Sequence, residues 1–135
     1  MAQRLSLLAT LGTATAALGA CAPAGEVPEE RGQAPVYQGV STILLDKDLV
    51  SVTVALRGGD GGPDVEAYGR CAAAQYALDQ GFGFARQVRT IVRKDGRTWM
   101  GDAAYLLSAE LPEGLRTIDV KAAVADCAAL GIPTH

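Results

Sequence analysis

The sequence predicts a small α+β domain in which an antiparallel sheet packs on one main helix. Three observations support this fold class. Apolar residues alternate in two neighbouring segments from residue 36, an alanine-rich helical segment follows, and a two-residue turn signal then separates two long strand-like segments. The chain has 135 residues, which is enough for one domain of modest size. The expected order is therefore strand, strand, helix and hairpin, followed by a C-terminal strand or short helix.

Residues 36–45 and 49–57 are expected to form the first pair of strands, joined by an Asp-Lys-Asp turn. The second segment has an apolar residue at every other position, as in a strand with one buried face. These apolar residues are Val50, Val52, Val54 and Leu56.

A glycine-rich segment, residues 58–63, breaks this pattern and is interpreted as a flexible connection, because no Lys-Ser/Thr of a phosphate-binding loop follows. A helix is expected over residues 65–80, with Asp64 as the N-cap and Gly81 at the C-terminal end. Helical spacing places one set of side chains on a common face. This set is Val65, Tyr68, Cys71, Ala72, Gln75, Tyr76 and Leu78.

Asp95 and Gly96 predict a type I′ turn that joins strands over residues 83–94 and 97–108. The expected cross-strand pairs are Lys94 with Arg97, Val92 with Trp99, Thr90 with Gly101, Val88 with Ala103, Arg86 with Tyr105, Arg89 with Asp102 and Ile91 with Met100. The expected apolar face consists of Phe84, Val88, Val92, Trp99, Ala103, Tyr105 and Leu107.

The C-terminal segment, residues 115–132, fits two patterns. Alternating apolar residues favour a strand over residues 116–124 that leads into a helical turn around Cys127. Residues 122–130 also fit a helix that stops at Gly131.

Cys71 and Cys127 are expected to form a structural disulfide, because residues 1–21 have the layout of a secretory signal peptide and an exported chain matures in an oxidising compartment. Closing a loop of this length stabilises a domain by about 4 kcal/mol in the chain-entropy model. A reactive or metal-binding pair is the alternative. It is disfavoured because there is no C-x-x-C spacing and the single histidine is His135. We therefore expect no metal, no cofactor and no enzymatic activity.

The N-terminal segment has the layout of a secretory signal peptide, with Arg4 ahead of an apolar stretch. The stretch ends in Leu18-Gly19-Ala20-Cys21, which resembles the lipobox of bacterial lipoproteins. This resemblance implies that residues 1–20 are removed and that Cys21 is lipidated, with residues 21–35 as a disordered tether to a domain over 36–135. An ordinary signal-peptidase cut after Ala24 is the alternative, giving a soluble exported protein.

The net charge of −3 argues against a nucleic-acid partner. The expected hairpin nevertheless concentrates positive charge, which could bind an envelope protein or an anionic glycan. The alternative is a solvated hairpin whose charges prevent edge pairing. The residues of this basic cluster are Arg86, Arg89, Arg93, Lys94 and Arg97.

Two segments, DVEAYGRCAAAQYALDQGFGFARQVRT and DCAALGIPT, resemble small uncharacterised lipoproteins of Gram-negative, alphaproteobacterial envelopes. The resemblance implies a lipid-anchored envelope protein that faces the periplasm, but it brings no known activity. We expect the domain to act as an accessory or interaction module. A soluble periplasmic ligand-binding or inhibitory protein is the other function considered. Ala22 replaces the Asp that retains some lipoproteins in the inner membrane, which favours the outer membrane.

Overall fold

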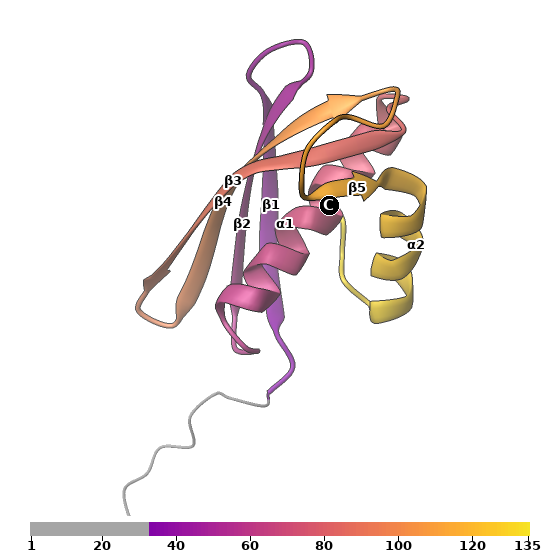
Figure 1. Ribbon diagram of the computed structural model, residues 1–135. Coiled ribbons are helices and arrows are strands. Elements are labelled where there is room, and N and C mark those ends of the chain that lie inside the picture. The colour runs from indigo at the N-terminus through magenta and orange to yellow at the C-terminus, as the bar shows by residue number, and fades with distance from the viewer. Residues whose placement is uncertain (1–32) are drawn as a thin grey trace, which may run out of the picture.

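The computed structural model describes residues 33–135, which form five strands and two helices (Figure 1). In chain order these elements are β1 (Val36–Leu44), β2 (Leu49–Arg57), α1 (Gly62–Asp79), β3 (Phe84–Asp95), β4 (Thr98–Ser108), β5 (Thr117–Asp119) and α2 (Val120–Leu130).

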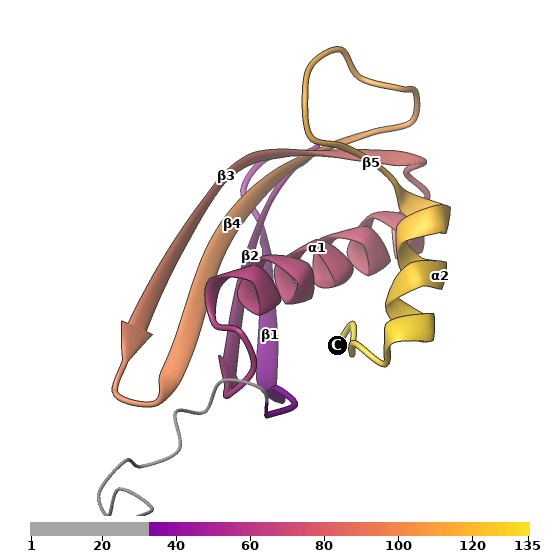
Figure 2. The ribbon, with the colours of Figure 1, turned by 60° about the horizontal axis from the view of Figure 1, so that its bottom comes forward.

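The strands form one antiparallel sheet in the order β1-β2-β4-β3-β5, and both helices lie on the same side of it (Figures 1 and 2). α1 lies across the concave face of the sheet, and α2 packs beside α1 near β5. The described residues therefore form two layers, and neither of their helices lies on the convex face of the sheet. We call the two sides the helix-covered face and the open face.

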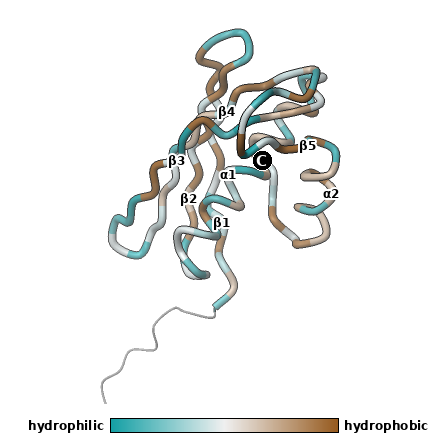
Figure 3. Tube along the Cα trace, viewed as in Figure 1, coloured by the Kyte–Doolittle hydropathy of each residue, from teal (hydrophilic) through white to brown (hydrophobic). Residues whose placement is uncertain are grey.

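The core lies between α1 and the helix-covered face. The two central strands, β2 and β4, alternate buried and less buried positions, as expected for a sheet with one packed side. Hydropathy follows this arrangement in Figure 3, where the turn between β1 and β2 and the tip of the β3–β4 hairpin are hydrophilic. The largest fully buried side chains are Tyr68, Tyr105, Leu56, Val50, Val52, Val54, Val65 and Val120.

The first strand pair lies where the sequence predicts it, and the alternating residues of β2 are buried. The helix begins earlier than expected, at Gly62, with Pro63 in its first turn. Gly61 is the N-cap, so the prediction that Asp64 fills this role is wrong. The Asp64 carboxylate instead accepts a hydrogen bond from the backbone N–H of Asp60 at 2.6 Å, which closes the preceding turn.

The hairpin exists, but its turn is shifted by one residue. Asp95 pairs with Thr98, so Gly96 and Arg97 are the central residues and the expected pairs are wrong. Gly96 has a positive φ of 60°, whereas Arg97 does not, which fits a type II′ turn with glycine first. Lys94 consequently lies opposite Trp99, and Ile91 rather than Arg89 lies opposite Asp102.

A β-bulge between Gln87 and Arg89 also changes the face that the first part of β3 presents. A bulge inserts one extra residue, so side chains on its two sides follow opposite parity. Ala85 is therefore fully buried, while Val88 is exposed and Phe84 shares the open face. The expected places of Phe84 and Val88 on the apolar face are wrong for this reason.

The C-terminal segment is mainly helical. The strand β5 has only three residues, and Asp119 then caps α2 by accepting a hydrogen bond from the N–H of Ala122 at 3.1 Å. α2 ends at Gly131, which adopts the left-handed conformation. The expected strand through residue 124 is wrong, and the helical layer has a second helix beside the main one.

Candidate functional site

The two helices are joined by a disulfide between Cys71 of α1 and Cys127 of α2, with their Cα atoms 5.9 Å apart. Both cysteines are buried, at 3% exposure each. The alanines around them are small enough to let α1 approach both α2 and the sheet. The pair expected from the sequence is thus present as a buried cross-link, placed away from the open face.

The structure distributes the basic cluster over different parts of the hairpin. Arg89 and Arg93 are exposed on the open face, with Ile91 between them. Lys94 lies on the opposite side of β3, where its ammonium group is 5.1 Å from the centre of the Trp99 ring in a cation–π contact. Arg97 occupies the turn. Only Arg89 and Arg93 therefore share a surface.

Arg86 is set apart from the rest of the cluster by the loop that joins β4 to β5. A Cβ placed on Gly114 would lie 3.3 Å from Cδ of Arg86, so this loop passes directly over the Arg86 side chain. The loop rises on the convex side of the sheet in Figure 2. Among the described residues, the Nε atom of Arg86 and the hydroxyl of its cross-strand neighbour Thr117 are buried without a hydrogen-bond partner.

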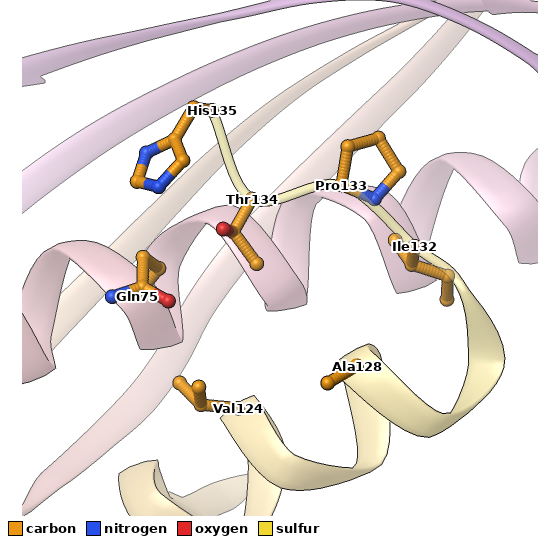
Figure 4. A pocket seen from close by; sticks show the side chains of 7 residues that line it. All are labelled: Gln75, Val124, Ala128, Ile132, Pro133, Thr134 and His135. Carbon is orange, nitrogen blue, oxygen red and sulfur yellow. The ribbon is translucent and has the colours of Figure 1, made fainter.

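An open pocket of about 320 Å³ lies between α1, α2 and the C-terminal segment (Figure 4). Its walls are mostly aliphatic, and the Gln75 amide that borders it already donates a hydrogen bond to Asp79 at 2.9 Å. Such a site can hold an apolar group, and the Gln75 amide, the Thr134 hydroxyl and the His135 imidazole are the polar groups at its border. The lining residues are Gln75, Val124, Ala128, Ile132, Pro133, Thr134 and His135.

Two tyrosines form an aromatic contact between β1 and α1 that the sequence analysis did not identify. The rings of Tyr37 and Tyr68 meet edge to face, with 4.7 Å between their centroids. Burial raises the pKa of the Tyr68 phenol, and a hydrogen bond from the backbone of Gly39 acts in the opposite direction. Tyr37 lies beside the bulge in β1, so spacing alone gives no reliable face for it.

Tyr105 is the most strongly perturbed tyrosine and lies on the helix-covered face of β4. Burial raises the pKa of Tyr105 to about 12, the positive charge of Arg70 lowers it, and the negative charge of Glu66 raises it. The phenol therefore remains neutral at physiological pH and belongs to the core. Its place on the apolar face agrees with the sequence prediction.

Among residues 33–135, no cluster of three or more His, Cys, Asp or Glu side chains is arranged to hold a metal ion. Within the same range, no helix is both long and apolar enough to cross a membrane. The predicted signal peptide, Cys21 and most of the predicted tether fall outside the described residues.

The fold and the paired cysteines can now be compared with known proteins. Residues 37–131 match the YNQ4 C-terminal domain family, and the chain belongs to this family. The "Uncharacterized 26.9 kDa protein in nqo8 5'region" of Paracoccus denitrificans is 36% identical over 85 residues. That alignment covers 63% of this chain and 33% of the relative, so the chain matches about a third of the relative's length. A relative from Paracoccus is consistent with the alphaproteobacterial resemblance noted above. No solved structure matches.

Proposed function

We propose that the chain is a lipid-anchored protein of the cell envelope, in which a disulfide-braced domain acts as an accessory or interaction module. The disulfide between Cys71 and Cys127 is the observation that carries this proposal. Such cross-links form and persist in oxidising compartments and are rare in the bacterial cytosol. An exported domain agrees with the lipobox-like sequence that ends at Cys21.

In this proposal Cys21 carries the acyl chains and residues 21–35 connect it to β1 on the periplasmic side, with the outer membrane as the favoured location. Stable anchoring takes about two lipid signals, which a diacylglyceryl group supplies. The domain contributes binding rather than catalysis. Its open face and the exposed Arg89 and Arg93 supply surface for an envelope protein or an anionic glycan.

Cell fractionation of the wild-type chain and a Cys21→Ser variant tests the anchor. The wild-type chain should sediment with membranes and be released by detergent, whereas Cys21→Ser should be soluble or retained as precursor. A double variant, Cys71→Ser with Cys127→Ser, is the matched control for cysteine loss and should remain with the membrane. A wild-type chain that is soluble after lysis would contradict the proposal.

A soluble periplasmic ligand-binding protein is the second candidate, and the pocket between α1 and α2 favours it. A ligand there would contact aliphatic side chains such as Val124 and Ile132. Replacing Ala128 with Phe should fill part of this pocket. This second candidate predicts that native mass spectrometry of protein purified from the periplasm detects a small bound molecule, which Ala128→Phe abolishes.

A further inference from the structure

The two edges of the sheet differ in how well they are protected against pairing with another strand. β5 pairs with β3 only at residues 84–86, so within the described chain the rest of β3 forms an open edge. That edge carries Arg89, Arg93, Lys94 and Asp95 and is interrupted by a bulge. Charged side chains and bulges are the features by which natural proteins prevent edge-to-edge association.

β1 forms the opposite edge and lacks most of this protection. None of its nine residues is charged and none is proline. Its own bulge lies near the beginning, between Tyr37 and Gly39, which leaves Gly39–Leu44 regular. The last two residues of β1 and the residue after it carry exposed aliphatic side chains, with Ile43 at 58%, Leu44 at 51% and Leu45 at 58% exposure. A regular, uncharged edge with exposed aliphatic residues is suited to strand pairing.

The described N-terminal residues leave this edge uncovered. The backbone N–H of Gly59 donates a hydrogen bond to the carbonyl of Gln33 at 3.0 Å, and Pro35 lies beside the same glycine. This contact turns residues 33–35 toward the end of β2 and away from the outer side of β1. Residues 33–35 therefore do not run along the outer edge of β1.

We propose that β1 pairs with β1 of a second copy of this chain, so that two sheets join into one continuous antiparallel sheet. In the pairing that fits best, Thr42 lies opposite Thr42 of the second copy, on the two-fold axis. Val40 then faces Leu44 and Ser41 faces Ile43 across the interface, and Gly39 faces Leu45. The faces match in this register, because even-numbered residues from Val40 to Leu44 lie on the helix-covered side in both copies.

Neighbouring registers are less suitable. Moving the axis to Ile43 would place the carboxylate of Asp46 opposite the apolar Val40. Moving it to Ser41 would extend the pairing into the bulge at Gln38, where the ladder is irregular. The register centred on Thr42 avoids both the charge and the bulge, and a two-fold contact of this kind is the usual form of a homodimer interface.

The contact between the two β1 strands is small. Pairing over seven residues per copy falls in the class of interfaces below about 1,200 Å², which are typical of weak and transient complexes. The lipid anchor of the proposed function would change this, because tethering to one membrane raises the effective concentration to the order of millimolar. The fraction of dimer on the membrane therefore depends on the proposed lipid anchor. The pairing of the two β1 edges does not require the lipid.

Disulfide trapping tests the pairing directly in the full mature chain. Thr42→Cys places one thiol from each copy at the axis, and Ile91→Cys is the matched control on the open face of β3. Under mild oxidation, Thr42→Cys should give a covalent dimer that retains the Cys71–Cys127 bond by peptide mapping, and Ile91→Cys should not. Equal dimer yields from both variants, or an adduct of Thr42→Cys with another protein alone, would overturn the proposal.

A second measurement does not depend on how well Thr42→Cys folds. Ile43 and Ile91 are similarly exposed, at 58% and 51%, so replacing either with Lys should leave the monomer folded. Sedimentation equilibrium should show self-association weakened by about tenfold or more in Ile43→Lys and unchanged in Ile91→Lys, since a lysine at the contact guards an edge. Equal association of Ile43→Lys and wild type would overturn the pairing.

The same trapping separates this proposal from the lipid anchor. Symmetric Thr42→Cys dimers formed in a Cys21→Ser background would support edge pairing even if the wild-type chain carries no lipid. A lipidated chain that yields no Thr42→Cys dimer would overturn edge pairing and leave the anchor intact.

Discussion

The helix-covered face and the open face of the sheet are built from the same strands but from different residues. On β2, the covered side presents the fully buried Val50, Val52 and Leu56, while the open side presents the small residues Ser51, Thr53 and Ala55 between Leu49 and Arg57. The open side includes Asp102, whose carboxylate accepts a hydrogen bond from the Ser51 hydroxyl at 3.3 Å. Because buried apolar residues alternate with less buried ones along β2, one face of the sheet forms the core. The other face remains available for contacts with other molecules.

The largest effect is expected from the disulfide, which braces the helical layer on the covered side. Replacing Cys71 and Cys127 together with Ala should lower the free energy of unfolding by about 4 kcal/mol, because the unfolded chain regains the freedom of the closed loop. Urea denaturation followed by circular dichroism measures the change. A loss below about 1 kcal/mol would show that packing of α2 on α1 does not need the bond.

The two faces of β2 can be compared with a single kind of substitution. Leu56→Ala should cost about 3 kcal/mol, since it removes a fully buried side chain and leaves a cavity against α1. Leu49→Ala, on the open face of the same strand, should cost about 1 kcal/mol because Leu49 is only partly buried. Equal costs in urea denaturation would show that the open face is packed as tightly as the covered one.

The close approach of α1 to β4 provides a third test. Gly101 lies on the covered face, and a Cβ there would collide with Cγ1 of Val65. Gly101→Ala should therefore destabilise the domain by about 2 kcal/mol through overpacking. Gly62→Ala, in the first turn of α1 with open space around it, is the matched control and should leave thermal stability unchanged or slightly higher. A neutral Gly101→Ala in a thermal melt would indicate that α1 shifts without cost.

The smallest effect concerns pH. Because the pKa of Tyr105 is raised to about 12 in the folded state, the unfolded chain ionises first as the pH rises. The stability contributed by this group is complete below pH 10 and is lost between pH 10 and 12, by about 1.4 kcal/mol at pH 11.

Comparison of the wild-type chain with Tyr105→Phe isolates this group from the other residues that titrate at high pH. Between pH 8 and pH 11, the wild-type chain should lose about 1.4 kcal/mol of unfolding free energy relative to Tyr105→Phe. An unchanged difference would mean that Tyr105 titrates near its ordinary value.

The sequence predicts the parts of this fold that depend on local pattern. β1, β2 and the body of α1 follow from alternation and from a run of helix-forming residues, and the pairing of Cys71 with Cys127 follows from their number and setting. The sequence also predicts the two hairpin strands, because a turn that contains Gly96 separates them.

The remaining features depend on contacts that no local pattern encodes. Whether Asp95 or Gly96 begins the turn is decided by the pairing of the whole strands. The bulge at Val88 cannot be predicted from the alternation of apolar and polar residues, because that alternation assumes a regular strand. The start of α2 is different, because its cap is a local contact. Asp119 accepts a hydrogen bond from the N–H of Ala122, at the point where the alternation of apolar residues favours a strand. The dispersion of the basic cluster follows from the same bulge and turn.

We propose that this family member is an exported, lipid-anchored domain with one internal disulfide. The most direct test is the intact mass of the chain purified from native membranes, before and after reduction. We predict a chain that begins at Cys21, carries acyl mass and gains about 2 Da on reduction of its disulfide. An unmodified chain beginning at Gly25, or one whose mass does not change on reduction, would contradict the account.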